Sequence, residues 1–572
     1  MTATDPSLRA ALTARFTAPG QEFELAERTV RGIPWRVYTR GSQTLRDVLL
    51  GTAQFGDRDF LIYGTERWTY AEHLRQVAGL ARCLLDEYGL CPGDRVAISM
   101  RNYPEWAPVF FATQVAGLVA VPLNAWWTGP ELRYALEDCG ALFVFADAER
   151  AALIAPSLDQ LGGVPLVEVR GGDVPAPGAR RWTELLESLP TDATVPDVDV
   201  APEDDATILY TSGTTGRPKG AIGTHRNHCT NLRNTQLGAL VGACIANGGE
   251  PPVPEPAAPQ PGSLCTFPLF HIAGITVLTY SVLNGTRLAT QYRWDVAEAR
   301  ELIRRERLTG VAGVPTVMRQ LVEGAAGQPE DLATLMAISM GGSSVPPDLI
   351  GRIDKTFTSL VAPANGYGLT ETTSSVVGNS GADYVAHPDS VGRCMPGADV
   401  RVVDPAIVED VAEGEVGELW FRGPNVVRGY WNNPEATAAA FTDGWFHTGD
   451  LGRVRDGWVY VVDRLKDVVI RGGENIYCAE VEAALFEHPA IEDAALVGVP
   501  HESLGEEAVA VVRLRPGATA TADDLRRHVG ERLASFKIPA HVVFWSDPLP
   551  RTASGKVLKR DLRSLVAGRV EG

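Results

Sequence analysis

Short apolar segments alternate with amphipathic ones along this sequence, and the alternation limits the folds open to it. RVAISM (95–100), LVAVPL (118–123) and ALFVFAD (141–147) are strand-like segments rich in Val, Ile and Leu. Helical segments separate them, one from Pro104 to about Val115 and one over 130–140. Strands that alternate with helices through short loops predict an α/β fold, with parallel-type sheets covered by helices.

The length and charge of the chain narrow its class. With 572 residues it is too long for one ordinary domain. A net charge of −19 argues against sequence-independent binding to nucleic acid or to an anionic membrane. The N-terminus lacks the apolar core of a signal peptide, and the scattered cysteines fit a reducing compartment, so we expect a cytoplasmic protein.

One segment is apolar enough to suggest a membrane. Residues 106–127 are largely apolar, but Pro108, Thr113, Gln114 and Pro122 interrupt them. We therefore expect a buried helix that leads into a core strand and no integral membrane segment. Transient contact with a membrane surface is compatible with the sequence. The Pro-rich segment 247–263 predicts an extended surface loop.

The pattern of the chain changes near residue 463. Residues 459–485 read as strand, charged turn, strand, Gly-rich loop and helix. Further strands are expected at 495–500, 506–514 and 541–545, with a helix over 522–533. This is a compact α+β unit of ordinary domain size. We place a domain boundary at Asp463–Arg464, which gives domains 1–463 and 464–572.

The stretch YTSGTTGRPKG (210–220) follows the apolar run 206–209 and is rich in hydroxyls and glycines. Glycine lets the backbone approach a ligand closely, and hydroxyl and N–H groups can surround an anion. Lys219 adds a positive charge. The stretch does not match the GxxxxGK[ST] loop, since Gly216 lies three residues before Lys219. It predicts a phosphate site, with a flexible surface loop as the alternative.

YTSGTTGRPKG resembles the phosphate-binding signature of the adenylate-forming superfamily, which includes acyl-CoA synthetases, peptide-synthetase adenylation domains and beetle luciferases. The order and spacing of the superfamily's further motifs match over roughly residues 45–565. These motifs are PLFHIAG (268–274), GGSSVPP (341–347), NGYGLTE (365–371), GELWFRGPNVVRGYWN (417–432), GWFHTGD (444–450), DRLKDVVIRGGENIYCAEVE (463–482), FKIP (536–539) and PRTASGKVLK (550–559).

The resemblance implies a two-step reaction that uses ATP, Mg²⁺ and coenzyme A. A carboxylate attacks the α-phosphate of ATP and releases pyrophosphate, and a thiol then attacks the acyl-adenylate and releases AMP. The implied fold is a large N-terminal domain with a β-barrel-like subdomain, followed by a small mobile α+β domain that carries the catalytic lysine, Lys556.

The resemblance also implies a role for each motif residue. Triphosphate contacts would come from Thr211, Ser212, Gly213, Thr214, Thr215, Gly216 and Lys219, and Mg²⁺ contacts from Glu371 and Thr211. Nucleoside contacts would come from Gly342, Ser343, Ser344, Asn365, Gly366, Tyr367, Gly368, Asp450 and Arg464. Thr370 would contact the α-phosphate, and Lys556 would bridge it to the substrate carboxylate. His271 would stand at the acyl pocket, Lys466 at the hinge, and Gly472 and Gly473 beside the pantetheine arm.

The segment 267–285 bears on the acid. It holds no acidic residue to pair with an α-ammonium group, which argues against an α-amino acid. The expected pocket is apolar and is formed by Ile272, Ala273, Gly274, Thr276, Val277, Val314 and Pro315. We expect a hydrophobic carboxylic acid, with a medium- or long-chain fatty acid favoured. The alternative is an aromatic, terpenoid or sterol-derived acid.

Other readings remain open. Free coenzyme A is favoured as the thiol, with loading of a carrier protein or arrest at the acyl-adenylate as alternatives. Oxidative luciferase chemistry is another possibility of the fold. A non-catalytic binder that keeps the fold predicts loss of Lys556, Glu371 or Asp450, and all three are present. The sequence is also compatible with a homodimer.

Overall fold

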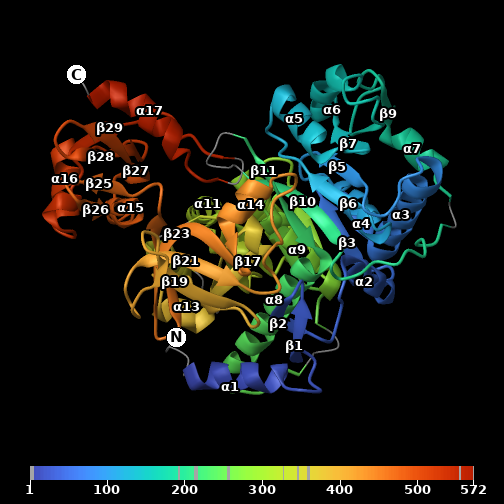
Figure 1. The fold of residues 1–572 in the computed structure, drawn as a ribbon, viewed down its shortest axis with the longest axis horizontal. Helices are drawn as coiled ribbons and strands as arrows, with labels where there is room; N and C mark the ends of the chain where they lie inside the picture. Colours follow the sequence, from blue (N-terminus) through green and yellow to red (C-terminus); the bar gives the residue numbers. More distant parts are fainter. Residues whose placement is uncertain are drawn as a thin grey trace.

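The computed structural model of the protein describes residues 6–190, 193–211, 217–253, 258–325, 328–343, 345, 347–356, 361–552 and 555–570. Its class is the predicted one: parallel-type sheets covered by helices form a large N-terminal part, and a smaller α+β part follows (Figure 1). In these described ranges we find no helix with both the length and the apolar character needed to cross a membrane.

The three strands predicted first lie in a seven-stranded sheet, which is parallel except for the pair β10–β11. Its order is β11 (Lys219–Thr224), β10 (Asp205–Thr211), β6 (Val119–Pro122), β5 (Arg95–Ser99), β7 (Phe143–Asp147), β8 (Leu166–Val169) and β9 (Ala179–Arg181). The helices around it are α2 (Leu45–Leu50), α3 (Tyr70–Arg82), α4 (Trp106–Val115), α5 (Gly129–Cys139), α6 (Ala148–Ile154) and α7 (Trp182–Ser188). Every residue of α4 is buried and β6 follows it, which confirms the buried helix expected in 106–127.

A nine-stranded sheet forms the centre of the molecule. Its order is β18 (Arg393–Cys394), β17 (Ser374–Ser380), β16 (Ala362–Leu369), β15 (Ala337–Gly341), β14 (Gly310–Gly313), β12 (Gly262–Cys265), β13 (Arg287–Thr290), β3 (Asp59–Tyr63) and β4 (Glu66–Thr69). One face packs on α10 (Val296–Glu306), α11 (Pro315–Gly324) and α12 (Pro347–Thr356). The other face meets α9 (Ile272–Asn284), and α8 (His225–Ala246) lies beside α9 and β17.

An antiparallel sheet corresponds to the expected β-barrel-like subdomain. It contains β19 (Asp399–Asp404), β20 (Glu409–Asp410), β21 (Gly417–Arg422), β22 (Phe441–Thr442), β23 (Trp445–Arg455) and β24 (Trp458–Arg464), with α13 (Gly381–Ala386) and α14 (Pro434–Ala440) nearby. The next strand belongs to a different sheet and begins at Val469. The sheets therefore change between Arg464 and Val469, and the domain boundary at Asp463–Arg464 stays a prediction.

The C-terminal sheet lies at one end of the molecule (Figure 1). Its strands are β25 (Val469–Arg471), β26 (Glu474–Ile476), β27 (Ile491–His501), β28 (Gly505–Leu514) and β29 (His541–Phe544), and its helices are α15 (Cys478–Phe486), α16 (Ala522–Gly530) and α17 (Lys559–Val570). Helix α16 ends at Gly530, earlier than the predicted Leu533. Gly530 packs so closely on Ile538 that a Cβ there would lie 2.9 Å from it.

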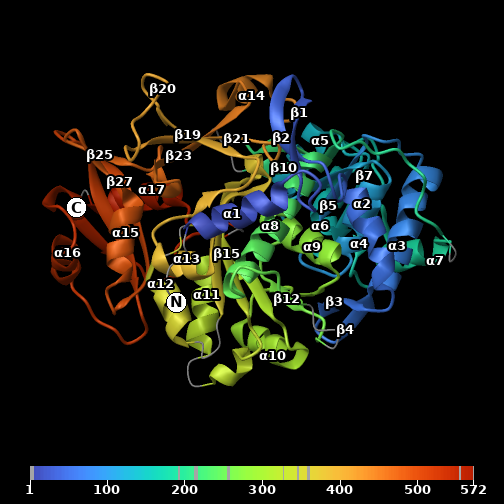
Figure 2. The same cartoon turned by 90° about the horizontal axis from the view of Figure 1, so that it is seen from below.

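The N-terminal segment packs on α8. Helix α1 (Pro6–Thr17) precedes the hairpin of β1 (Leu25–Val30) and β2 (Ile33–Tyr38), and it lies across α8 (Figure 2). Leu12 packs with Leu237 and Val241 of α8 in a separate hydrophobic cluster. The Pro-rich segment has no helix or strand over 247–253 and 258–261, as expected of a loop, and 254–257 lie outside the described residues. The predicted loop ends earlier than 263, because Gly262 and Ser263 begin β12.

Candidate active site

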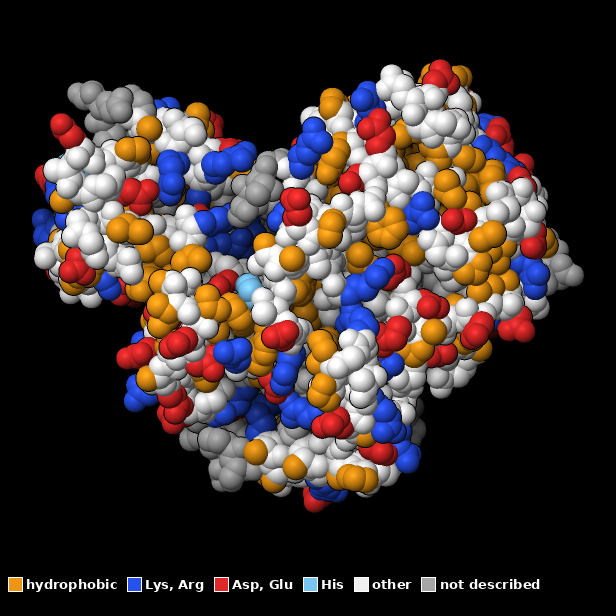
Figure 3. All heavy atoms as spheres, in the orientation of Figure 1, with side chains coloured by type: hydrophobic (Ala, Val, Ile, Leu, Met, Phe, Trp, Pro, Cys, Tyr) orange, Lys and Arg blue, Asp and Glu red, His pale blue; other side chains and the backbone are white. Residues whose placement is uncertain are grey.

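A cavity of about 1640 Å³ begins at the carboxyl ends of the central parallel strands and brings most of the predicted site residues together. This is the position at which open α/β sheets bind ligands. Figure 3 shows Lys and Arg side chains gathered in the hollow between the C-terminal part and the rest of the molecule. The predicted residues that line the cavity are Thr211, Lys219, His271, Gly342, Asn365, Gly366, Gly368, Thr370, Glu371, Arg464, Lys466 and Lys556.

Other predicted residues lie elsewhere. Residues 212–216 and Ser344 fall outside the described residues, so the positions of Ser212, Gly213, Thr214, Thr215 and Gly216 are not given by the structure. Five described residues do not line the cavity: Ser343, Tyr367, Asp450, Gly472 and Gly473. The last two form the turn between β25 and β26. The ligand roles of all these residues stay predictions.

Lys556 is presented by a short hairpin. The backbone N–H of Thr552 donates to the carbonyl of Lys556 at 2.7 Å, and Arg551 pairs with Val557 across an isolated β-bridge. The Arg551 guanidinium donates to both carboxylate oxygens of Asp493 at 2.7 Å, which fixes the hairpin to β27. Gly555 has φ +83, and a Cβ there would lie 3.1 Å from Val314. The Ser-Gly-Lys sequence thus needs its glycine both for the turn and for close approach to the large domain.

The ammonium of Lys556 has no ion-pair partner among the residues that the structure describes. Its pKa is lowered to about 8: burial and then the positive charge of Arg464 lower it, and the charges of Asp450 and Glu371 partly offset this. Lys219, Lys466 and Lys556 form no ion pair within the described part of the chain, where the ion-paired lysines are Lys537 and Lys559. The cavity therefore offers unpaired positive charge to an anionic ligand.

Two carboxylates stand near this positive charge. Glu371, on a short 3₁₀ turn after β16, is 7% exposed, and one of its oxygens accepts a hydrogen bond from the Tyr430 hydroxyl at 2.8 Å. Asp450 accepts from the Tyr367 hydroxyl at 2.7 Å and pairs with Nε of Arg464 at 3.0 Å. The Tyr367 hydroxyl thus orients the Asp450 carboxylate, and the Tyr367 ring packs toward Phe421.

The β10–β11 hairpin holds the described flanks of the Gly-rich loop. Thr211 ends β10 and lies opposite Lys219, the first residue of β11. The Lys219 ammonium lies 5.2 Å from the centre of the Tyr430 ring. Since Tyr430 also bonds Glu371, one aromatic residue contacts both a cation and a carboxylate of the site.

His271 is the N-cap residue of α9. Its Nδ1 accepts from the backbone N–H of Ala273 at 3.3 Å. Burial, and to a smaller extent the charge of Lys556, lower its pKa to about 4, so the ring is neutral at pH 7. Because Nδ1 accepts, the proton of the neutral ring lies on Nε2, and His271 is available to the cavity as a hydrogen-bond donor.

Away from the charged end, the cavity continues between the central sheet and α8 and α9. Most of the strand residues that line it there are small: Ser263, Gly310, Ala312, Ala337, Ser339, Gly341, Ala362, Ala364, Gly366 and Ser380. The larger residues of the same strands that also line it are Val311, Met340, Asn365 and Asn379. The parallel register places Ser339 beside Ala364, and the antiparallel register places Ala364 beside Ser380. Five neighbouring strands, β12 and β14–β17, thus present a face of mostly small side chains.

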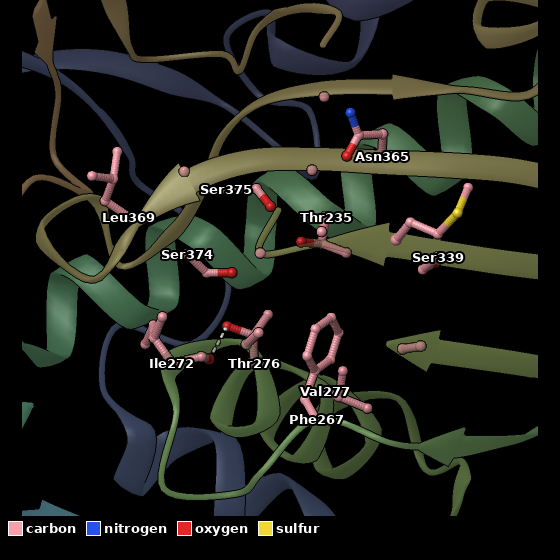
Figure 4. A pocket seen from close by; sticks show the side chains of 18 of the residues that line it. Thr235, Phe267, Ile272, Thr276, Val277, Ser339, Asn365, Leu369, Ser374 and Ser375 are labelled. Carbon is pink, nitrogen blue, oxygen red and sulfur yellow. Dashed lines mark hydrogen bonds between the residues drawn. The ribbon is translucent and has the colours of Figure 1, made fainter. Parts of the chain in front are cut away.

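The facing side of α8 is also lined mostly by small residues, with Asn234 and Ile245 as the larger ones. Thr235, Gly238, Ala239, Gly242, Ala243 and Ala246 line the cavity at helical spacing. A Cβ added to Gly238 or Gly242 would have nothing within 4 Å. In Figure 4, Phe267, Thr276 and Val277 lie on one side of this space and Ser339 and Asn365 on the other. We call the space between these strands and α8–α9 the slot.

The expected apolar pocket is present in part. Ile272, Ala273, Thr276 and Val277 line the cavity. Gly274 does not, because it packs on the backbone of Pro268, where a Cβ would lie 2.2 Å from the carbonyl oxygen. Val314 and Pro315 also do not line it, since Val314 is covered by Gly342 and Gly555 and Pro315 begins α11.

The sequence matches two family models. Residues 51–431 match the model described as AMP-binding enzyme, and residues 480–556 match the model described as AMP-binding enzyme C-terminal domain. The chain belongs to the AMP-binding enzyme family. The superfamily resemblance is thereby confirmed, and the protein is an acid–thiol ligase that forms AMP and uses ATP, Mg²⁺ and coenzyme A.

Similar proteins within this family include ligases of aromatic acids. The chain is 38% identical over 504 residues to a feruloyl-CoA synthase of an Amycolatopsis species, covering 88% of this chain and 94% of that one. It is 35% identical over 512 residues to the 2-succinylbenzoate–CoA ligase of Geobacillus kaustophilus, with coverage of 88% and 94%. The ATP-bound MatB of Rhodopseudomonas palustris has a TM-score of 0.79 and 29% identity, covering 92% of this chain and 99% of that one.

Sequence reasoning missed three parts of this site. Tyr430 lies within the quoted segment 417–432, whose match to the superfamily motif could have indicated it. The small residues of α8 recur at intervals of three and four, a helical pattern that could have indicated a bare face. Leu8 and Arg9 of α1 also line the cavity, and no sequence signal points to them.

Proposed function

We propose that this enzyme activates a hydrophobic carboxylic acid whose acyl group is broad and contains rings. The shape of the slot supports the proposal. The slot spans five neighbouring strands, roughly 19 Å at about 4.8 Å per strand. Along β15 it runs from Met336 to Gly341, roughly 17 Å at about 3.3 Å per residue. One alkyl chain needs the length but not the width, whereas a terpenoid or sterol-derived acid uses both.

A medium- or long-chain fatty acid, which the sequence analysis favours, is the second candidate. The length of the slot and its apolar α9 side, with Ile272 and Val277, support it. A planar aromatic acid would fill only the part nearest Lys556. The names of the two curated relatives refer to aromatic acids. The aromatic class therefore stays among the candidates.

In the first half-reaction the protein must bring a carboxylate to a polyanion. Lys219 would hold the triphosphate together with the hydroxyl of Thr211, and Thr370 would contact the α-phosphate. Lys556 would lie between the α-phosphate and the attacking carboxylate, where its unpaired charge cancels their repulsion. Donors fixed in advance at the point where negative charge develops supply most of the catalysis in such reactions. The neutral His271 would donate to a carboxylate oxygen and orient the acid.

The carboxylate of Glu371 fits Mg²⁺. It is buried at the edge of the cavity and its one observed bond, from Tyr430, leaves further oxygen lone pairs for a hard cation. Thr211 would add a hydroxyl oxygen. When bound there, Mg²⁺ would neutralise phosphate charge. Asp450, oriented by Tyr367 and Arg464, would accept hydrogen bonds from the ribose hydroxyls, and Asn365, Gly342, Gly366 and Gly368 would border the base.

The second half-reaction calls for a different arrangement of the small domain. Lys556 lines the cavity while Gly472 and Gly473 do not. We infer that rotation about Lys466 withdraws Lys556 and brings the β25–β26 turn to the site, where its glycines leave room for the pantetheine arm of free coenzyme A. Loading of a carrier protein is the alternative. A cytoplasmic location and a homodimer stay predictions.

The decisive measurement is AMP release with ATP, Mg²⁺ and coenzyme A over a panel of acids. The panel runs from acetate through palmitate, ferulate and abietate to 5β-cholanate. We expect coenzyme A-dependent AMP release to be fastest with abietate or 5β-cholanate, whereas a maximum at ferulate would favour the aromatic class. A maximum at palmitate would favour the fatty-acid candidate, and pyrophosphate release that is independent of coenzyme A would favour carrier loading or arrest at the acyl-adenylate.

A further inference from the structure

We propose that Arg9, on the N-terminal helix, determines specificity by binding a neutral oxygen atom at the end of the acyl group remote from its carboxylate. The inference rests on the proposed function, because it concerns the acid held in the slot. It assigns the substrate a further feature, a hydroxyl or ketone group on the far side of its ring system.

Helix α1 closes the end of the slot opposite Lys556. Leu8 and Arg9 line the cavity there, together with Ile245 and Ala246 at the end of α8. Ser380 at the end of β17 and Gly381 and Ala382 at the start of α13 complete this end wall. Leu12, one turn further along α1, packs against Leu237 and Val241 on the other side of α8. Helix α1, which forms part of this end wall, is thus held on α8 by a separate hydrophobic cluster. Helix α1 also lies before residue 51, where the family match begins.

A single ion pair fixes the side chain of Arg9. Its Nε donates to Oδ2 of Asp383 on α13 at 2.7 Å, and the two side chains are 24% and 9% exposed. Its other N–H groups make no hydrogen bond within the described part of the chain, so most of the donors of the guanidinium remain available. The other charged residues that line the cavity lie at its catalytic end or, for Glu131, on α5 beside the other large sheet.

The chemistry of this end wall favours a neutral oxygen. Asp383 already balances the charge of Arg9, so a second carboxylate would bring an uncompensated negative charge into the slot. A plain hydrocarbon would cover the free donors without pairing them, which is costly in a buried site. Ser339 and Ser380, which flank Ala364 in the sheet that lines the slot, add two hydroxyls. Neither hydroxyl forms a hydrogen bond with a described residue. A hydroxyl or ketone satisfies these groups.

The test compares acids that differ only in the remote oxygen. Lithocholate and 5β-cholanate differ by one ring hydroxyl, and 16-hydroxypalmitate and palmitate differ by one terminal hydroxyl. We expect the wild-type ratio of kcat/KM to favour the hydroxylated member of at least one pair. Arg9→Met should lower that ratio about tenfold to a hundredfold, the value of a hydrogen bond to a charged group. Arg15→Met is the matched control, since Arg15 lies on the same helix but is half exposed and does not line the cavity.

Each outcome decides the point. A ratio that is the same in wild type and Arg9→Met, with AMP still released, overturns the inference and leaves the proposed function intact. Absence of AMP release with every acid in the wild type would instead refute the proposed function. If Arg9→Met does not fold, Arg9→Lys replaces it. A lysine ammonium that pairs with Asp383 takes the position of Nε and lacks the outer N–H groups of the guanidinium, so the ratio should still fall. Arg9-dependent preference for hexadecanedioate over 16-hydroxypalmitate would overturn the neutral-oxygen class.

Discussion

The catalytic end of the cavity and the slot differ in what gives them their function. At the catalytic end, charged side chains reach the cavity from four distant segments, with Lys219, Glu371, Lys466 and Lys556 as examples. In the slot, side chains are missing where a sheet and a helix would ordinarily pack together, as at Ala364 and Gly242. The catalytic end therefore acts through charged side chains, whereas the slot acts through the space that small residues leave open.

Both ends cost stability, for different physical reasons. Burying the Lys556 ammonium without a partner carries a desolvation penalty, which its lowered pKa reflects. Glycine and alanine are poor strand formers, and glycine within α8 is less favourable than alanine by about 0.5–1 kcal/mol. Neither feature helps the fold, which is the expected sign of residues kept for a ligand.

The largest expected effect is at Lys556. Lys556→Ala should slow acyl-adenylate formation from ATP at least a hundredfold to a thousandfold, because it removes a fixed positive charge from the reacting atoms. Conversion of a supplied acyl-adenylate and coenzyme A to AMP should change little. Separate assays of pyrophosphate release and of thiolysis measure the two steps. Equal loss in both would refute the role of Lys556 in the first half-reaction.

The opposite pattern is expected at the hinge. Lys466 lies between the last strand of one sheet and the first strand of the next. Lys466→Pro fixes φ at this position and should hinder rotation of the small domain, slowing thiolysis about a hundredfold while pyrophosphate release continues. Single-turnover measurements on the two steps check this. Normal overall turnover in the variant would remove Lys466 from the hinge.

The same contrast explains what could be predicted from the sequence. The catalytic residues lie in contiguous motifs, so the sequence alone indicated Lys219, Glu371 and Lys556, and the structure brings them into one cavity. The strand–helix alternation likewise indicated β5, β6 and β7, because each is a continuous apolar run, as expected of a strand that is buried on both faces. The family match confirms the superfamily that these motifs indicated.

The slot could not be found in this way. Its floor comes from five strands whose small residues are separated by long stretches of chain, and only the register places Ser339, Ala364 and Ser380 in one row. These strand residues form no contiguous motif, so their common position cannot be recognised from the sequence. Packing also excluded Gly274, Val314 and Pro315 from the pocket in which the sequence placed them, since each is covered by neighbouring backbone or side chains.

A bulky side chain in the slot should impair the binding of broad acids and leave the catalytic end unaffected. Gly242→Phe places a ring where a Cβ now meets nothing within 4 Å. It should lower kcat/KM for 5β-cholanate or abietate more than tenfold, whereas acetate should be affected much less because it does not reach α8. Gly351→Phe is the matched control, since Gly351 is an exposed helix residue outside the cavity with equal space around it. Parallel losses for all acids would contradict the assignment of the slot to the acyl group.

The pH dependence should report the catalytic end alone. Lys556 carries its charge below a pKa of about 8 and loses it above. The value of kcat/KM for pyrophosphate release should therefore fall as pH rises through about 8, by about tenfold per unit at higher pH. Lys556→Arg should move this fall to higher pH, because a guanidinium remains protonated there. A profile that is flat to pH 10 in the wild type would show that the reaction does not depend on this ammonium.

The smallest effect concerns stability and tests whether the bare face of α8 is kept for a ligand. Gly238→Ala adds one methyl group into open space and removes a residue that disfavours helix. It should raise the free energy of unfolding by about 0.5–1 kcal/mol, measured by urea denaturation without ligand. The same methyl group narrows the slot, so KM for the broadest acids should rise. A variant that is more stable and binds those acids as well as the wild type would leave Gly238 without a functional reason. A rise in both quantities would show stability given up for width at this position.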